Sequence, residues 1–416
     1  MRCFLNQYIK YICHYLGIIK HSFLLVCVCM ATINATANTI DLKDAVNIAT
    51  KNYLATRFFN ATFMFASKDT VLDMGAKGIF DLNGEQLKVN EKMPIASGTK
   101  PITAAAILRL YDQGKLDVKD PISKYLIAES DIWTGKMPNW ADHISIHNLL
   151  THTSGIAEYY MHTPINTSMS LLEINKSIIN FAAQKPLEFN PGDRYQYCNT
   201  NFVFLGLIIE KVSGKQLAQF FHDEFFMPLK MKSSYLPSLE ESILIQKNDS
   251  DHSLYPVRYV AIPTNRKPKL EQAKFDYIFV PYADGGVFSN TRDMITWYKA
   301  LHQGQILSNK SYKMMTTKYR AVSDKADHMG RKTYTGYGVF ISKFPNGDTM
   351  IHHSGSKGAI SETGFIAEKE LYFAILGNVS MESRDKISKS IDLNKPENQL
   401  DIIYFREAVL KSIEDS

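Results

Sequence analysis

Segments with the character of β-strands lie near both ends of this 416-residue chain, and helix-like segments lie between them. Residues 57–66 and 70–77 are rich in aromatic and β-branched side chains and are separated by Ser67-Lys68-Asp69, which predicts an antiparallel hairpin. The last third predicts an antiparallel meander from four short apolar segments: 337–342, 349–353, 360–366 and 371–376. A polar, proline-containing stretch, 247–272, predicts a long surface excursion without regular structure.

The first 37 residues have the composition of a secretory signal peptide. Their charged residues are all basic: Arg2, Lys10 and Lys20. Residues 23–31 form an apolar run that is too short to span a bilayer, and Ala35-Thr36-Ala37 resembles a signal-peptidase cleavage site. We therefore expect residues 1–37 to be removed, leaving a periplasmic or secreted protein with no membrane span in the mature chain. An uncleaved membrane anchor and a misassigned start codon are the alternatives.

Removing this leader changes the charge and the cysteine content of the chain. The formal net charge of +5 loses three positive charges and becomes +2, so electrostatic binding of nucleic acid is not indicated. Four of the five cysteines lie in the leader, and only Cys198 remains. We therefore expect no intrachain disulfide in the mature chain, whose stability must come from its core.

A serine and a lysine three residues apart are the first candidates for chemistry. Ser97-Gly98-Thr99-Lys100 follows an apolar run, 93–96, and opens a helix-like segment, 102–111, that stops at Gly114. Because residues i and i+3 share a face of a helix, Lys100 can reach the Ser97 hydroxyl. The helix N-terminus also favours negative charge that develops nearby. The alternative is that Ser97 only caps the helix.

Two further groups of polar residues are candidates, each with a structural alternative. Tyr197 and Asn199 point the same way if the segment that precedes the helix ending at Gly214 is extended; alternatively, Asn199 only caps that helix. His353-Ser354-Gly355 ends the second strand of the meander, where it can face a cleft, but His353 can also be an ordinary surface histidine.

A pair of histidines has a spacing that could hold a metal ion. His143 and His147 are four residues apart, but no third ligand of matching context follows. We therefore expect these two side chains and His152 to be structural, and we expect no metal site.

Taken together, the three polar motifs resemble those of the serine β-lactamase and penicillin-binding protein superfamily. Ser97-x-x-Lys100, Tyr197-Cys198-Asn199 and His353-Ser354-Gly355 occur in the order and context of the class C-like branch, which includes class C β-lactamases, D-alanyl-D-alanine carboxypeptidases and esterases. The resemblance covers roughly residues 45–385. It extends to three secondary landmarks: Leu149-Leu150-Thr151-His152-Thr153-Ser154-Gly155, Pro191-Gly192-Asp193 and Gly285-Gly286-Val287.

This resemblance implies an α+β fold. An antiparallel sheet, built from the N- and C-terminal parts of the chain and flanked by helices, would pack against a mostly helical middle domain. The implied boundaries are 38–100 and 280–416 for the discontinuous sheet domain and 101–279 for the helical domain. The active site would lie in the groove between them.

The same resemblance implies a role for each motif residue. Ser97 would attack a carbonyl and become acylated, and Lys100 or the phenol of Tyr197 would take its proton. Asn199 would bind the substrate amide and orient Lys100. His353, Ser354, Gly355 and Ser356 would bind substrate, and the backbone N–H groups of Ser97 and Ser356 would form the oxyanion hole, each worth ~3 kcal/mol. No metal or organic cofactor is implied.

Departures from the family pattern shift the expected substrate. His353 stands where β-lactamases carry a lysine, and its imidazole, with an ordinary pKa near ~6.5, would be mostly neutral at neutral pH. Recognition of a substrate carboxylate should therefore be weak and should improve as the pH falls through that pKa. We expect an exported serine hydrolase acting on amides or esters, such as peptidoglycan peptides. The alternatives are a true class C-type β-lactamase and a non-catalytic binding or scaffold relative.

Overall fold

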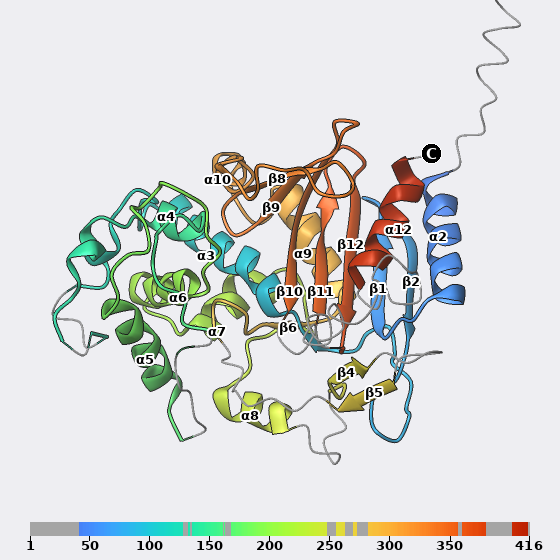
Figure 1. The fold of residues 1–416 in the computed structure, drawn as a ribbon, viewed down its shortest axis with the longest axis horizontal. Helices are drawn as coiled ribbons and strands as arrows, with labels where there is room; N and C mark the ends of the chain where they lie inside the picture. Colours follow the sequence, from blue (N-terminus) through green and yellow to red (C-terminus); the bar gives the residue numbers. More distant parts are fainter. Residues whose placement is uncertain are drawn as a thin grey trace, which may run out of the picture.

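The computed structural model describes the greater part of the chain after the predicted leader. The described residues are 41–127, 132–133, 135–160, 162, 168–247, 255–262, 269–272, 282–356, 360–379 and 402–414. Figure 1 shows their arrangement, in which an antiparallel sheet stands beside a largely helical region formed by the middle of the chain. The predicted signal peptide, 1–37, lies outside the described residues.

The main sheet joins strands from the two ends of the described chain. Its order is β2-β1-β12-β11-β10-β9-β8-β7, and every neighbouring pair is antiparallel. The strands are β1 (Ala61–Ala66), β2 (Val71–Lys77), β7 (Arg320–Ala321), β8 (Lys332–Thr335), β9 (Phe340–Lys343), β10 (Thr349–Ser356), β11 (Ile360–Ile366) and β12 (Leu371–Gly377). The pairing of β1 with β12 places Ala61 opposite Gly377. The resemblance therefore predicted the fold correctly: the sheet is built from both ends of the chain.

Helices cover both faces of the centre of this sheet, where β1, β11 and β12 are buried on both sides. Successive side chains of a strand point to opposite faces. Phe63 and Phe65 of β1 pack with α2 (Leu42–Thr56) and α12 (Ile402–Glu414), where the ring of Phe405 lies 5.0 Å from that of Phe63. Met64 packs on the other face, in the cluster that includes α9 (Thr291–His302).

The helical region is organised around α3 (Lys100–Asp112), whose residues 100–108 are all buried. A helix that is buried on all sides must lie in the interior of the molecule. The other helices of the region are α4 (Ile146–Leu150), α5 (Leu171–Ala183), α6 (Thr200–Ser213), α7 (Leu217–Phe221) and α8 (Leu239–Lys247), and α10 (Asn309–Met315) packs on α3 from the sheet side. The buried helix α6 ends at Gly214, which adopts the left-handed conformation with φ 69°.

Two local expectations need correction. The first strand begins at Ala61 rather than at residue 57, since residues 57–60 connect it to helix α2, which ends at Thr56 and which the sequence analysis did not identify. The expected surface excursion, 247–272, contains a small antiparallel sheet of β4 (Tyr259–Ile262) and β5 (Lys269–Gln272), and Tyr259 is buried. The helix α12 was also missed. Within the described ranges, no helix combines the length and apolar character that crossing a bilayer requires.

Candidate active site

Ser97 lies on a tight turn that connects a strand to the buried helix α3. The short strand β3 (Met93–Pro94) pairs with β6 (Phe288–Ser289), and a 3₁₀ turn over Ala96–Thr99 follows. The backbone of Ala96 has φ 46°, a left-handed conformation that is strained for a residue with a side chain. Two hydrogen bonds hold Ile95 just before it: its N–H donates to the carbonyl of Val287 (2.9 Å), and its carbonyl accepts from the Ser361 hydroxyl (2.6 Å).

Lys100 is fully buried directly beneath Ser97. Its Nζ donates to three oxygens: Ser97 Oγ at 3.0 Å, Asn199 Oδ1 at 2.8 Å and the carbonyl of Asp284 at 2.5 Å. Burial lowers the pKa of Lys100 from 10.5 to about 8, although the negative charges of Asp284 and Glu158 oppose this shift. A substantial fraction of Lys100 is therefore neutral near pH 8 and can accept the Ser97 proton across the same 3.0 Å contact.

Tyr197 forms part of the pocket wall above Lys100. The Nζ of Lys100 lies 5.0 Å from the centre of the Tyr197 ring, a cation–π contact that favours the charged lysine. Burial raises the pKa of the Tyr197 phenol well above its usual value, and a hydrogen bond with Ser97 only partly offsets this effect. Near neutral pH, the neutral amine of Lys100 is therefore more populated than the phenolate of Tyr197, which makes Lys100 the better candidate for the base.

His152 supports the other face of the Tyr197 ring. The two rings are stacked with centres 4.5 Å apart. Nδ1 of His152 accepts the backbone N–H of Cys198 (3.1 Å), and burial holds the pKa of this imidazole well below 6.5. Cys198 itself points away from the pocket, since its buried thiol donates to the carbonyl of Ile156 (3.4 Å). His152 is thus structural, as predicted, but it also fixes the position of Tyr197.

Asn199 connects Lys100 to an acidic residue that the sequence analysis did not identify. Its Oδ1 accepts from Lys100, while its Nδ2 and backbone N–H donate to Oε2 of Glu158 at 3.2 and 2.5 Å. Asn199 stands at the start of α6, but its side chain makes no capping hydrogen bond there. Burial raises the pKa of Glu158. This geometry makes Asn199 an orienting group for Lys100.

The end of β10 supplies the opposite wall of the site. His353 is 2% exposed, and its ring centre lies 4.9 Å from that of Phe340. Its Nδ1 donates to the carbonyl of Ser354 (2.6 Å). A Cβ on Gly355 would lie 2.2 Å from the carbonyl of Ile95, so only glycine allows β10 to approach the Ser97 turn this closely. Ser356 is exposed at the rim.

The expected titration of His353 near its ordinary pKa is wrong. Burial, and then the charge of Lys100, lower the pKa of this imidazole to about 3. His353 is therefore neutral near neutral pH. It does not become positively charged as the pH falls through 6.5, so it cannot pair with a substrate carboxylate there.

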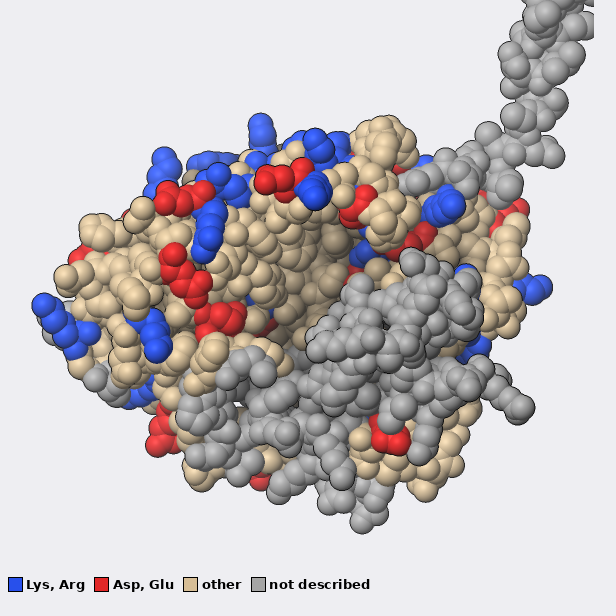
Figure 2. Space-filling view, in the orientation of Figure 1, with Lys and Arg blue, Asp and Glu red and all other residues tan. Residues whose placement is uncertain are grey.

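A pocket of about 290 Å³ brings these residues together. It contains seven of the eight predicted site residues: Ser97, Tyr197, Asn199, His353, Ser354, Gly355 and Ser356. The eighth, Lys100, lies beneath Ser97. The sequence analysis did not assign four further lining residues to the site: Tyr160, Asp284, Gly285 and Phe340. Figure 2 shows that this side of the molecule is hollowed near its middle and that Lys and Arg side chains gather along its upper edge, over α10 and β8.

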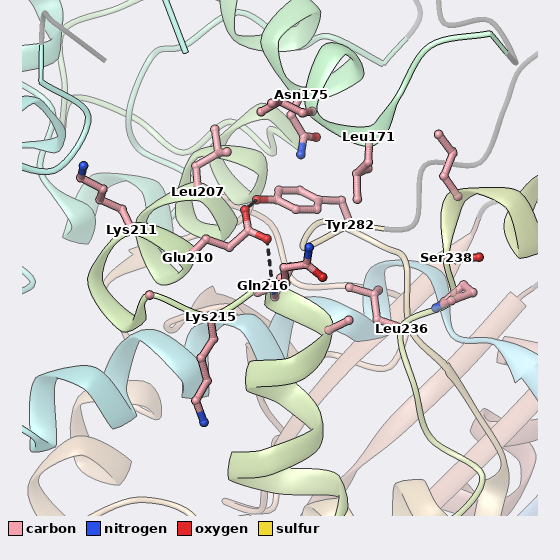
Figure 3. A pocket seen from close by; sticks show the side chains of 16 residues that line it. Leu171, Asn175, Leu207, Glu210, Lys211, Lys215, Gln216, Leu236, Ser238 and Tyr282 are labelled. Carbon is pink, nitrogen blue, oxygen red and sulfur yellow. Dashed lines mark hydrogen bonds between the residues drawn. The ribbon is translucent and has the colours of Figure 1, made fainter. Parts of the chain in front are cut away.

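A second, larger cavity lies between α5, α6 and α7 (Figure 3). Its volume is about 910 Å³, and leucines from these helices line much of it. Glu210 lines this cavity and accepts hydrogen bonds from the Tyr282 hydroxyl (2.8 Å) and the backbone N–H of Leu217 (2.9 Å). None of its described lining residues is arranged as a nucleophile and base.

His143 and His147, the pair whose spacing could hold a metal ion, have different surroundings. Nδ1 of His147 lies 2.8 Å from the hydroxyl of Tyr337, whereas His143 is exposed. Among the residues that the structure describes, no three His, Cys, Asp or Glu side chains are grouped as metal ligands.

Comparison with known proteins identifies related chains. The family model for Beta-lactamase matches residues 68–392. Penicillin-binding protein 4* of Bacillus subtilis (strain 168) is 28% identical over 303 residues, which cover 71% of this chain and 63% of that protein. N-acetylmuramyl-L-alanine amidase of the same strain is 28% identical over 218 residues, covering 50% of this chain and 49% of the relative. The chain thus spans about half to two thirds of the length of these relatives.

Solved structures share the fold. The octameric penicillin-binding protein homologue from Pyrococcus abyssi has a TM-score of 0.64 and 24% identity, covering 82% of this chain and 74% of that one. The D-amino acid amidase from Ochrobactrum anthropi SV3, solved with L-phenylalanine amide, has a TM-score of 0.68 and 20% identity, covering 90% and 99%. Since the family model spans most of the chain and the fold agrees, the chain belongs to the Beta-lactamase family.

Proposed function

We propose that this protein is an exported serine hydrolase that cleaves amide or ester bonds through an acyl-enzyme on Ser97. One observation carries the proposal: the buried amine of Lys100, with a pKa of about 8, lies 3.0 Å from Ser97 Oγ. A serine hydroxyl is a weak nucleophile unless an adjacent base takes its proton. Neutral Lys100 meets that requirement in the pocket.

The proposed reaction has two halves. Neutral Lys100 takes the Ser97 proton while Oγ bonds to the substrate carbonyl carbon, and the carbonyl oxygen becomes an oxyanion. The resulting ammonium then gives its proton to the leaving amine or alcohol as the bond to it breaks, which leaves the acyl group on Ser97. Water attacks the ester in the second half, and the same nitrogen takes a proton from water and returns it to Oγ.

The substrate class follows from what the β10 wall offers. His353 is neutral, so it supplies no positive charge for the carboxylate of a β-lactam or of a terminal D-alanine. We therefore favour simple amides, esters, and D-amino-acid peptides without a free carboxylate at the cleaved residue over β-lactams. The amidase among the structural relatives and EstCE1, described as a hydrolase with promiscuous acyltransferase activity, are compatible with that choice. A true β-lactamase and a non-catalytic relative remain the competing functions.

The site of action is part of the same proposal. The basic leader, its apolar run and the Ala35-Thr36-Ala37 sequence support export to the periplasm or the medium. N-terminal sequencing of the secreted protein is expected to begin near Asn38. A cytoplasmic pool that starts at Met1 would contradict export without affecting the proposed chemistry.

Covalent labelling tests the chemistry directly. A fluorophosphonate probe is expected to add one equivalent to the wild-type protein, measured by intact mass, and none to Ser97→Ala. The exposed serine Ser356 provides a matched control, because Ser356→Ala keeps the nucleophile and should still be labelled. Equal labelling of Ser97→Ala and wild type, or no labelling of either, would reject the acyl-enzyme.

A further inference from the structure

Asp284 is an acidic residue in the wall of the catalytic pocket. It is 4% exposed and lines the pocket together with Ser97 and Asn199. Its Oδ2 accepts a hydrogen bond from the Tyr159 hydroxyl (2.9 Å), but its Oδ1 has no hydrogen-bond partner among the described residues. A buried carboxylate oxygen without a partner is costly, so a cation that enters the pocket would compensate it.

The charges around the pocket also favour a cationic ligand. Asp284 and Glu158 are the two acidic groups whose negative charges raise the pKa of Lys100. The histidines on both sides, His152 and His353, are neutral because their pKa values lie far below neutrality. Among the described lining residues there is no arginine or lysine. Lys100, directly beneath Ser97 and with a pKa of about 8, offsets one of these two negative charges when it is protonated. The remaining negative charge repels a ligand carboxylate and attracts a ligand ammonium.

The turn that carries Asp284 is held from both sides. The Asp284 carbonyl accepts from Lys100, and the Ala283 carbonyl accepts from the Thr103 hydroxyl (2.7 Å). Tyr282 is anchored in the larger cavity by its hydrogen bond to Glu210, as Figure 3 shows. A Cβ on Gly206 would lie 2.6 Å from the Tyr282 ring, so α6 packs directly against this turn. The carboxylate is therefore held in place before substrate arrives.

We propose that Asp284 makes the pocket selective for acyl groups that carry a protonated amine, as in α-amino-acid amides and esters with a free amino group. This inference rests on the proposed serine hydrolase function and names its substrate class. The ammonium lies next to the carbonyl carbon in such substrates, so a group in the wall beside Ser97 can reach it while Oγ attacks. Asp284 acts here as a specificity-determining residue and takes no part in proton transfer.

A matched pair of substrates tests the proposal. Alanine p-nitroanilide and lactic acid p-nitroanilide differ only in an ammonium against a hydroxyl next to the carbonyl, and both enantiomers of each are assayed at pH 7. Wild type is expected to favour the ammonium substrate by about tenfold or more in kcat/KM, the size typical of a hydrogen bond to a charged group. Asp284→Asn is expected to bring that ratio near one, mainly by slowing the alanine substrate.

The controls separate this inference from the proposed function. Asp142→Asn removes an exposed acid outside the pocket lining and should keep the wild-type ratio. A wild-type ratio near one, or an unchanged ratio in Asp284→Asn, overturns the inference while a Ser97 adduct still supports the hydrolase. Activity that survives in Ser97→Ala overturns the hydrolase instead.

A binding measurement covers the case in which Asp284→Asn does not fold. Calorimetry on Ser97→Ala, which cannot turn over substrate by the proposed route, compares alaninamide with lactamide. Tighter binding of alaninamide, by about tenfold, supports the inference, and equal binding of the two overturns it. The kcat/KM ratio of the two anilides in wild type, and this comparison of binding, both test the preference for an ammonium group without the Asp284 variant.

Discussion

The two walls of the catalytic pocket differ in how they are held. The wall from the helical region is a chain of hydrogen bonds between charged and polar groups, running from Ser97 through Lys100 and Asn199 to Glu158. The wall from β10 carries a neutral imidazole packed between rings, and the backbone of this strand is fixed by its neighbours in the sheet. In the proposed mechanism, proton transfer therefore belongs to the helical wall, whereas the β10 wall shapes the space for substrate.

Removing the amine from the helical wall should have the largest effect. Lys100→Met keeps an unbranched, buried side chain but takes away the base that lies 3.0 Å from Ser97 Oγ. We expect kcat/KM to fall by about 10³-fold or more, as for other members of a nucleophile–base pair, and labelling by a fluorophosphonate to be lost. Stopped-flow acylation rates measure this directly. A drop of less than tenfold would assign the proton to Tyr197 instead.

Breaking the middle of the same wall should cost less. Asn199→Ala leaves Lys100 and Glu158 each without one buried hydrogen-bond partner. We expect a loss of about 1–3 kcal/mol in the free energy of unfolding and a reduction of kcat by about ten- to a hundredfold. Chemical denaturation and steady-state kinetics measure the two effects. Full activity in this variant would show that Lys100 needs no orienting amide.

Glu158, the last residue in the hydrogen-bond chain of the helical wall, should influence the pH dependence of kcat/KM through its effect on the pKa of Lys100. Lys100 acts as a base only when neutral, so kcat/KM should fall as the pH drops below about 8. Because the negative charge of Glu158 raises the pKa of Lys100, Glu158→Gln should lower that pKa and move this limb to lower pH.

Several other titratable groups face Lys100. They are Asp284 and Cys198, whose negative forms raise its pKa, and His152, Tyr197 and His353. Both histidines are neutral near neutral pH because burial lowers their pKa values, and the phenol of Tyr197 stays protonated because burial raises its pKa. A limb that does not move in Glu158→Gln, or one that moves to higher pH, would contradict the assignment of Lys100 as the base.

Changing the β10 wall should alter substrate preference more than rate. His353→Lys introduces an amine where typical β-lactamases carry one, and it should raise the kcat/KM for nitrocefin relative to p-nitrophenyl acetate by about two- to tenfold. His353→Gln is the matched control, since it removes the ring without adding charge. If both variants keep the wild-type preference, carboxylate recognition lies elsewhere in the pocket.

The sequence analysis located the polar residues that lie near one another along the chain or follow a regular element. Ser97 and Lys100 are one helical turn apart, and Asn199 precedes a helix with a clear apolar face, so these positions follow from local patterning. His353 was expected to end its strand, but β10 continues to Ser356 and His353 lies inside it. Predicting that these segments meet required the resemblance to a family, because periodicity does not specify tertiary contacts.

Residues that act through tertiary contacts left no signal in the sequence. Glu158 lies in a loop, and its role depends on its hydrogen bonds to Asn199, 41 residues further along, and on its charge near Lys100. Asp284 was not identified, although it directly precedes the landmark Gly285-Gly286-Val287, because its buried, unpartnered oxygen is a feature of the folded structure only. The shift in the pKa of His353 has the same origin: the residue type was identified, but the degree of burial was not.

The central pairing of β1 with β12 has a consequence for the order in which the molecule forms. Contacts between residues so distant in sequence close late, because a large loop must lose its entropy first. The turn that carries Ser97 is made early in synthesis, yet it is held by Ser361 from β11 and approached by Gly355 from β10. A growing chain should therefore remain unable to acylate Ser97 until its last strands are available. If the proposed export takes place before the chain has folded, Ser97 would become reactive only after passage through the membrane.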